Sequence, residues 1–347
     1  MISTTAEVRE QHRFDPAALE RYMREHVAGF AGPLGVKQFR GGQSNPTYYL
    51  TAGGREYVLR RKPPGKLLPS AHAVDREYRV ITALGGIGFP VPRTYALCED
   101  AGVIGTVFYI MDCVHGRVIT DPAIPGLTPH ERAAVYDSLG EVQARLHTVD
   151  WQALGLGDFG KPGNYFARQI HRWTQQYRAS ETEKIEAMER LIAWLPEHLP
   201  PGDETTLVHG DFRLGNTIIH PTEPRVAAVL DWELSTLGHP LADLAYNCLP
   251  YRFTREWEGL ADKNLAELGI PTEEDYVAAY CRRTRRAGIP DWDFCLAFAM
   301  FRLAAIAQGI MGRALAGTAN DPNARERGAR ARPLAESAWA LVAGCAG

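Results

Sequence analysis

The stretch LVHGDFRLGNTIIH, residues Leu207–His220, places a histidine, an aspartate, an arginine and an asparagine within eight positions between apolar flanks. Its apolar end, Thr217–Ile219, predicts a short strand. Asp211 and Asn216 therefore lie five positions apart in the loop that precedes this strand. A carboxylate and an amide at this spacing fit a loop that positions a base and a metal ligand.

A second acid, Asp231, follows the apolar run Val226–Leu230 and comes 15 residues after Asn216. A carboxylate at the end of a buried strand is costly unless it is paired, and a divalent cation is one such partner. Magnesium takes oxygen ligands, commonly one or two protein groups together with phosphates and water. Asn216 and Asp231 are the predicted metal ligands, which leaves Asp211 to accept the proton of an attacking hydroxyl.

This arrangement is typical of phosphoryl transfer, in which catalysis is mostly positioning and charge neutralisation. The spacing from Asp211 to Asn216 equals that between the aspartate and the asparagine of the kinase catalytic loop. Each residue alone could equally cap a turn or satisfy backbone groups. The ordered set of three polar residues favours catalysis.

The surrounding chain of 347 residues changes character near its first third. Strand-like runs dominate residues 1–112, which include a helical segment at Phe14–Val27 and a hairpin turn at Ala52–Gly54. Residues 113–347 are rich in helical periodicity, starting with a capping box at Thr128, and they contain a small β insert. The sequence predicts an α+β protein with two lobes divided after residue 112.

Composition narrows the class of protein. The net charge of −3 argues against a dedicated nucleic-acid binder. The six cysteines form no Cys-x-x-Cys pair, the N-terminal sequence is too polar for a signal peptide, and we expect no membrane-spanning run. We expect a cytoplasmic protein that acts on a small molecule, with no nucleic-acid or membrane partner; its oligomeric state stays open. Residues 320–333 are expected to be mobile.

The glycines Gly155, Gly157 and Gly160 match a Gly-x-Gly-x-x-Gly pattern. In dinucleotide-binding proteins this pattern follows a strand inside a βαβ unit, whereas here it follows a predicted helix. We interpret it as a loop.

Three segments together carry a family resemblance: VHGDFRLGN (208–216), AAVLDWE (227–233) and GHPLADLAY (238–246). They resemble the aminoglycoside phosphotransferase and choline kinase group, over a region from about residue 30 to the end. The resemblance implies a protein-kinase-like fold with a β-rich N-lobe and a mainly helical C-lobe. It also implies ATP and Mg²⁺ as cofactors.

Two further segments, residues 57–81 and 301–317, resemble the kinase-like domain that is joined to the dehydrogenase in certain acyl-CoA dehydrogenase family members. No dehydrogenase portion is expected in this chain, so the resemblance does not imply a flavin role.

The resemblance assigns nucleotide contacts to the N-lobe. In the segment RGGQSNPTYYL, Gly42 would let the backbone approach phosphate and Ser44 would donate a hydrogen bond, although the segment also fits a plain hairpin turn. Arg60 falls where kinases carry their phosphate-pairing lysine, and Lys62 remains an alternative. Glu77 is the matching helix acid, with Asp75 as the second choice.

The resemblance also assigns roles around the catalytic loop. The backbone of Asp112 and Val114 would hold the adenine edge, and Arg213 would lie near the transferred phosphoryl group. Asp243 would tie down the catalytic loop from a helix.

His209 is expected to order the loop more than to exchange protons. Glu233 is a weaker candidate, which would reach the metal through water.

The acceptor is less well specified. Aminoglycosides are polycations and call for carboxylates, whereas the helical part holds arginines at 282, 283, 285, 286, 302 and 313. A run of this kind is commonly a solvated face, but arginines in a pocket would indicate an anionic acceptor. The dehydrogenase-linked relatives suggest a hydroxyacyl-CoA. A nucleotide-binding pseudokinase, favoured by arginine at position 60, and a true aminoglycoside phosphotransferase are the alternatives, and ATP is not distinguished from GTP.

Overall fold

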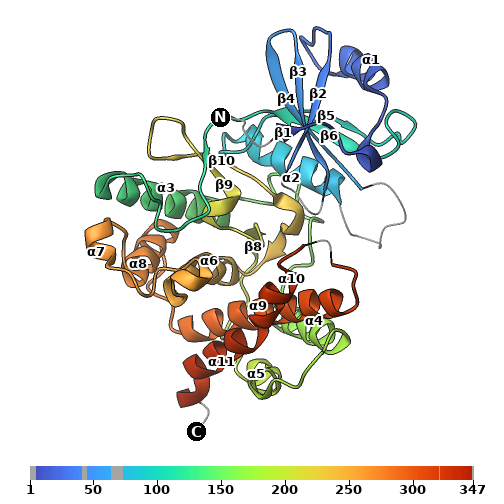
Figure 1. Ribbon diagram of the computed structural model, residues 1–347. Helices are drawn as coiled ribbons and strands as arrows, with labels where there is room; N and C mark the ends of the chain where they lie inside the picture. The colour runs from blue at the N-terminus through green and yellow to red at the C-terminus, as the bar shows by residue number, and fades with distance from the viewer. Residues whose placement is uncertain (1–4, 41–44, 64–72, 320, 346–347) are drawn as a thin grey trace.

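The computed structural model describes residues 5–40, 45–63, 73–319 and 321–345, and it has two lobes (Figure 1). The upper lobe in the figure is built on a sheet with two helices, and the lower lobe is mainly helical. This is the α+β, kinase-like architecture predicted from the sequence. Strand β6 ends at Asp112, and the division of the chain after this residue stays a prediction.

The upper lobe contains a six-stranded antiparallel sheet in the order β1-β2-β3-β4-β6-β5. Its hairpin turn is the predicted one, because Gly53 and Gly54 both have positive φ angles, 56° and 76°, as the favoured two-residue hairpin turns require. The strands are β1 (Thr5–Ala6), β2 (Gly35–Phe39), β3 (Thr47–Ala52), β4 (Arg55–Arg61), β5 (Thr94–Cys98) and β6 (Phe108–Asp112).

Alternation along β4 decides which side chains reach the space between the lobes. Tyr57 and Leu59 are buried in a small core with helix α1 (Pro16–His26), whereas Val58 belongs to the main core that continues into the lower lobe. Successive side chains of a strand point to opposite faces. Arg60 therefore shares the face of Val58, which is turned toward helix α2 (Val74–Gly86) and the lower lobe.

The lower lobe is built mainly from helices, with a three-stranded sheet in the order β10-β9-β7 and a two-stranded sheet of β11 and β8 on its side toward the upper lobe (Figure 1). The capping box predicted at Thr128 is present, since its side chain accepts from the Glu131 N–H and the Glu131 carboxylate accepts from the Thr128 N–H. The helices are α3 (Pro129–His147), α4 (Tyr165–Ala179), α5 (Glu186–Glu197), α6 (Pro240–Cys248), α7 (Leu265–Leu268), α8 (Glu273–Thr284), α9 (Trp292–Leu315), α10 (Ala324–Ala329) and α11 (Ala331–Val342). The strands are β7 (Arg117–Val118), β8 (Thr206–Val208), β9 (Thr217–Ile219), β10 (Val226–Val229) and β11 (Thr236–Gly238).

Helix α9 is the central helix of the lower lobe and packs against α4, α6, α10 and α11. It is long and apolar enough to cross a membrane by length and composition, a segment that the sequence prediction overlooked. However, 72% of its most apolar window is buried inside the protein, as in the core helix of a soluble domain. The apolar composition of α9 is thus explained by packing.

Two smaller sequence predictions have different outcomes. Residues Gly155–Gly160 lie in turns, as expected from their position after a helix. The expectation that residues 320–333 are mobile is wrong for the described helical residues, because α10 and the start of α11 pack on α9 there. The charged residues of this stretch cover the exposed side of short helices whose small residues Ala324 and Gly328 are buried.

Candidate active site

The predicted catalytic loop lies between β8 and β9. Hydrogen bonds between Asp211 and Asn216 hold it together. The amide nitrogen Nδ2 of Asn216 donates to the backbone oxygen of Asp211 at 2.9 Å and to its Oδ2 at 2.7 Å. Since an ionised carboxylate and a carbonyl can only accept, the NH₂ group of Asn216 must face Asp211. The amide oxygen of Asn216 is therefore directed away from Asp211.

Asp231 lies next to this loop because the backbone N–H of Leu230 donates to the carbonyl of Asn216 at 2.8 Å. The Asp231 backbone is left-handed, with φ of 66°, an uncommon conformation for a residue other than glycine that often accompanies a functional constraint. Its Oδ1 accepts from Arg60, and within the described ranges its Oδ2 makes no hydrogen bond. The amide oxygen of Asn216 and the Oδ2 of Asp231 thus remain as possible metal ligands, and oxygen ligands of this kind fit Mg²⁺.

Asp243 on α6 anchors the backbone of the catalytic loop, as predicted. Its carboxylate accepts from the N–H of His209 at 3.0 Å and from the N–H of Gly210 at 2.8 Å. His147 on α3 lies 3.2 Å from the same carboxylate. Burial by itself would raise the pKa of Asp243, but these hydrogen bonds and the nearby histidines outweigh it and lower the pKa.

His209 uses both ring nitrogens to shape the loop. The backbone N–H of Asp211 donates to His209 Nδ1 at 3.2 Å, so Nε2 carries the proton and donates to the Leu230 carbonyl at 2.8 Å. The side chain is fully buried. His209 therefore orders the loop, as expected, and no ring nitrogen remains for proton exchange.

Gly210 is required at its position for two reasons. Its φ of 82° is left-handed, and a Cβ atom built there would lie 2.6 Å from the Leu234 carbonyl oxygen. Its own carbonyl accepts a hydrogen bond of 2.7 Å from Arg302 on α9. Arg302 was expected as a possible pocket residue, but it is buried beneath the catalytic loop, where it holds the backbone.

Arg60 lies at the centre of a partly buried charge cluster between the lobes. Its Nε is 3.1 Å from Glu77 on α2, and its Nη2 donates to Asp231 at 2.6 Å and lies 3.6 Å from Glu233. Burial opposes the charged form of Arg60, but the surrounding acids outweigh this and raise its pKa. Lys62, the alternative to Arg60, instead pairs with Asp75 at 3.3 Å.

Glu77 is satisfied by three neighbours. Besides Arg60, its carboxylate accepts hydrogen bonds from Asn45 Nδ2 at 2.9 Å and from the Tyr109 hydroxyl at 3.1 Å. Burial raises the pKa of Glu77 to about 7, with Asp231 adding to this effect and Arg60 opposing it. No local pattern pointed to Asn45 or Tyr109, because each lies 32 positions from Glu77 in the chain.

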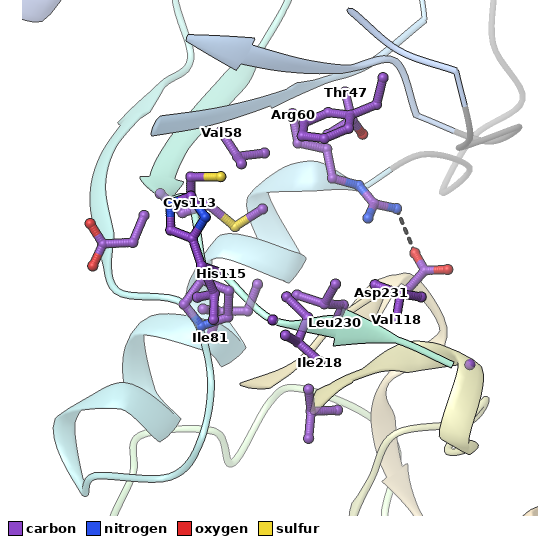
Figure 2. Close-up of a pocket in the computed structure, with 18 of the residues that line it drawn as sticks. Thr47, Val58, Arg60, Ile81, Cys113, His115, Val118, Ile218, Leu230 and Asp231 are labelled. Atoms are coloured by element: carbon purple, nitrogen blue, oxygen red, sulfur yellow. Dashed lines mark hydrogen bonds and ion pairs between the residues drawn. The ribbon is translucent and has the colours of Figure 1, made fainter. Parts of the chain in front are cut away.

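A pocket of about 650 Å³ lies between the lobes next to this cluster, and we call it the interlobe pocket. Figure 2 shows Val58 on its upper side, Ile218 and Leu230 on its lower side, and the Arg60–Asp231 hydrogen bond at one end. Most of its other lining residues are apolar or belong to the segment that links the lobes, including Phe39, Ile81, Met111, Asp112, Cys113, Val114, His115, Val118 and Val229. Its size and its two apolar faces suit a flat aromatic base.

The linking segment places the predicted hinge residues at the wall of this pocket. The Asp112 N–H is already used, since it donates to the Arg93 carbonyl at 2.8 Å. In the described part of the chain the Val114 N–H has no hydrogen-bond partner, so this donor is available to a ligand. Gly42 and Ser44, the predicted phosphate-covering residues, lie outside the described residues.

A second pocket of about 580 Å³, here named the helical pocket, opens on the other side of the catalytic loop. Asp211 lines it, and Arg213 lines both this pocket and the interlobe pocket. The Arg213 Nε lies 3.5 Å from the Asp211 carboxylate. The other lining residues come mainly from α6, α9, α10 and the intervening segments, and include Tyr246, Leu249, Phe253, Trp257, Leu303, Ile306 and Ile310.

Tyr246 was missed by sequence reasoning. It lies on α6, three residues after Asp243, and borders the helical pocket together with Asp211. Burial and the neighbouring Asp211 carboxylate raise the pKa of Tyr246, so its hydroxyl stays protonated. Tyr246 ends the segment GHPLADLAY, which carries part of the family resemblance. Its hydroxyl-bearing side chain was the available sign that it borders the pocket beside Asp211.

None of the arginines in the run at 282–286 lines the helical pocket, so the conditional argument for an anionic acceptor gains no support from them. Arg283 pairs with Asp137 at 2.6 Å and Arg286 pairs with Glu204, both on the outside of the helical lobe. Arg282 and Arg286 border a separate hollow beside α8. The solvated-face alternative applies to this run.

Comparison with known proteins agrees with this geometry. Residues 35–295 match the family model described as the phosphotransferase enzyme family. The chain is 48% identical over 342 residues to acyl-CoA dehydrogenase family member 10 of Mus musculus, covering 97% of the chain and 32% of that protein. It is 46% identical over 346 residues to family member 11 of Homo sapiens, covering 98% of the chain and 44% of that protein. The chain thus spans less than half the length of these curated relatives.

Solved structures share the fold. A protein from Ralstonia eutropha, provisionally assigned as an aminoglycoside phosphotransferase, has a TM-score of 0.89 and 54% identity, with 96% of this chain and 99% of that chain covered. Choline kinase from Cryptosporidium parvum has a TM-score of 0.67 at 12% identity, covering 96% and 97%. A ternary complex of aminoglycoside phosphotransferase APH(4)-Ia with AMP-PNP and hygromycin B has a TM-score of 0.61 at 19% identity, covering 94% and 99%. The last two show the fold alone, whereas the family match and the curated relatives show that the chain belongs to the phosphotransferase enzyme family.

Proposed function

We propose that the protein is an ATP- and Mg²⁺-dependent kinase that phosphorylates a hydroxyl group of a small molecule. The observation that carries this proposal is the position of Asp211, which lines the helical pocket, while Arg213 borders both pockets. A hydroxyl in the helical pocket would meet Asp211 as proton acceptor, and a nucleotide in the interlobe pocket would present its terminal phosphoryl group from the side of Arg213.

The roles of the remaining residues follow from their contacts. Asn216 and Asp231 would hold Mg²⁺, which neutralises charge on the nucleotide phosphates when bound. Arg60, oriented by Glu77, would contact a phosphate, and its bond to Asp231 would rearrange when the nucleotide enters. The hydrogen bond from Asn216 occupies Oδ2 of Asp211. The other oxygen, Oδ1, lies 3.5 Å from Arg213 Nε and would face the substrate hydroxyl.

The base of the nucleotide would lie between Val58 above and Ile218 and Leu230 below, with its edge at the free N–H of Val114. ATP is favoured as the donor because the fold is shared with a phosphotransferase solved with AMP-PNP. The backbone N–H of Val114 could donate a hydrogen bond to either adenine or guanine. The assay below therefore compares ATP with GTP as the donor.

The acceptor is proposed to be a hydroxyacyl-CoA. The helical pocket has apolar walls formed by Leu249, Phe253 and Leu303 among others, which suit an acyl chain that ends near Asp211. The curated relatives carry the acyl-CoA dehydrogenase name. A cytoplasmic location is likewise proposed, because the five described cysteines are free thiols, as in proteins of a reducing compartment.

An aminoglycoside acceptor is less well supported by the same pocket. Its carboxylates are Asp211, Glu258 and Glu326, and they are matched in number by arginines at 213, 327 and 330. A polycation would need a surplus of carboxylates. The name given to the similar Ralstonia protein is the main observation in favour of this acceptor.

A pseudokinase is the alternative from the binding class. It is favoured by arginine at position 60, whose bond to Asp231 competes with a metal ion for the same carboxylate. Mg²⁺-dependent stabilisation by ATP without turnover of any alcohol would support it.

The test is a panel assay of ADP or GDP release with ATP or GTP, using hydroxyacyl-CoAs of several chain lengths, choline, sugars and aminoglycosides as acceptors. We expect turnover of a hydroxyacyl-CoA that is abolished by EDTA and restored by added Mg²⁺. Turnover of another alcohol with none of the hydroxyacyl-CoAs would reject the proposed acceptor. Turnover unaffected by the Asp211→Ala substitution would reject the mechanism.

A further inference from the structure

A third cavity, of about 730 Å³, lies where the two lobes meet beyond the helical pocket, and we call it the basic pocket. The upper lobe contributes the segment before α1, the end of β2 and the proline residues at 46 and 63; the lower lobe contributes the end of α9 and α10. Its charged lining residues are Arg9, Arg40, Arg313, Arg327 and Asp321, and His12 also borders it. Four arginines face a single carboxylate.

The positive charge of the basic pocket is largely uncompensated. Asp321 pairs with Arg327 at 3.2 Å. Among the residues that the structure describes, no carboxylate lies within ion-pair distance of Arg9, Arg40 or Arg313. Arginines without partners in a concave site are well suited to bind phosphate, because the guanidinium group offers a planar fork of N–H donors.

The basic pocket adjoins the helical pocket. Ile310 and Arg327 line both cavities. On α9, Leu303, Ile306 and Ile310 line the helical pocket and Arg313 lines the basic pocket, at spacings of three or four residues that keep them on one face of the helix.

This face of α9 runs from the catalytic loop to the basic pocket. An α-helix rises about 1.5 Å per residue, so Arg313 lies about 15 Å along α9 from Leu303. Leu303 is next to Arg302, which holds the catalytic loop through Gly210. A ligand that reaches from Asp211 to the arginines of the basic pocket therefore extends along much of this helix face, and it is longer than a simple sugar or choline.

We infer that the basic pocket binds the phosphate-bearing tail of an elongated acceptor, with Arg9, Arg40 and Arg313 as its contacts, while the reacting hydroxyl lies at Asp211. The inference rests on the proposed function for the identity of the reaction, but not for the binding of the tail. Because the arginines come from both lobes, the tail joins the lobes when it binds.

The test measures binding by calorimetry and needs no turnover. Coenzyme A is titrated into the protein saturated with Mg²⁺ and AMP-PNP, so that its adenine nucleotide portion cannot occupy the interlobe pocket. We expect binding that weakens at least tenfold for Arg313→Ala and for Arg9→Ala, and more for the double variant. The matched control is Arg282→Ala beside α8, which should leave affinity unchanged. All three side chains are on the outside of the fold, and thermal melting checks that each variant folds.

Pantetheine, which has no phosphate, should bind at least tenfold more weakly than coenzyme A, and pyrophosphate should compete with coenzyme A. The inference is overturned if pantetheine binds as well as coenzyme A, if coenzyme A fails to bind once AMP-PNP is present, or if the arginine substitutions leave affinity unchanged. Binding that depends on the arginines, without turnover of any hydroxyacyl-CoA, would sustain the tail site and reject only the proposed reaction. If a hydroxyacyl-CoA is turned over and its KM is unchanged in the Arg9→Ala and Arg313→Ala variants, the proposed reaction stands and the tail site is rejected.

Discussion

Arg60 on β4 and Asp231, 171 positions later in the chain, are joined by a hydrogen bond of 2.6 Å that links the two lobes. The same guanidinium contacts Glu77 on α2. One arginine thus connects the upper sheet, the upper helix and the strand end that carries the proposed metal ligand. Its contacts explain why the charge cluster is both a structural link and a candidate for phosphate binding.

Replacing Arg60 with alanine should destabilise the protein and weaken ATP binding together. Glu77 would be left buried without its cation, and breaking a buried pair in this way costs about 3–5 kcal/mol. Urea denaturation measures the loss, and ATP affinity is measured by calorimetry. Adding Glu77→Gln to Arg60→Ala should restore part of the stability but none of the affinity; restored affinity would show that Arg60 acts only through Glu77.

Replacing Asp211 with asparagine should remove turnover while leaving nucleotide binding intact. Loss of a general base lowers kcat by about 10²–10⁴-fold, and Asp211 does not line the interlobe pocket. Steady-state kinetics and the affinity for Mg²⁺ with AMP-PNP separate the two effects. Asp137→Asn, which removes an acid paired with Arg283 on the outer surface, is the control and should retain full activity. Equal loss in both variants would contradict the assignment.

Gly210→Ala should cost more stability than Gly105→Ala, although both glycines have φ angles near 85°. The left-handed backbone costs about 1–2 kcal/mol for a residue with a Cβ atom. At Gly105 nothing lies within 4 Å of the added Cβ, whereas at Gly210 the Leu234 carbonyl oxygen lies 2.6 Å away. Chemical denaturation of both variants isolates the steric part, and equal destabilisation would show that the loop shifts without strain.

Protonation of His239, the N-cap of α6, should lower the free energy of unfolding in mildly acidic solution. Burial lowers its pKa to about 4, with Arg286 adding to this effect and Glu204 and Asp203 opposing it. In the unfolded chain His239 has its ordinary pKa of 6.5, so the unfolded state binds the proton at a higher pH than the folded state does. The contribution of neutral His239 to the free energy of unfolding is therefore complete above pH 6.5. It is lost as the pH falls toward 4, by about 3 kcal/mol.

Denaturation at pH 7, 5.5 and 4 in the wild type and in His239→Asn tests this dependence. Asparagine keeps an N-cap acceptor but cannot titrate, so the variant should lose less stability between pH 7 and 4. Identical pH profiles would place the acid sensitivity elsewhere.

The reacting groups could be predicted from the sequence because they lie close together along it. Asp211 and Asn216 share one loop, and Asp231 follows the next strand, so spacing alone brought them together. Asp243 and Arg60 were assigned through the family resemblance. Strand alternation alone left Lys62 as an alternative, because residues two positions apart share a strand face.

The partners that complete the site could not be predicted because each contact spans a long stretch of chain. Asn45 and Tyr109 reach Glu77 across 32 positions each, and Arg302 reaches Gly210 across 92. The arginine run at 282–286 was ambiguous because charge in a helix does not reveal which face is solvated. In α9 the position of Arg302 amid apolar residues was a usable signal, since a buried charge requires a partner.

The reacting groups and most of the helical pocket wall come from different parts of the gene. Every proposed reacting group of the lower lobe lies within the 21 residues from Asp211 to Asp231, whereas most residues that line the helical pocket come after residue 245. Mutations can therefore reshape the acceptor pocket without touching the chemistry. Such a separation lets one lineage change its substrate in small steps while it retains a working transferase throughout.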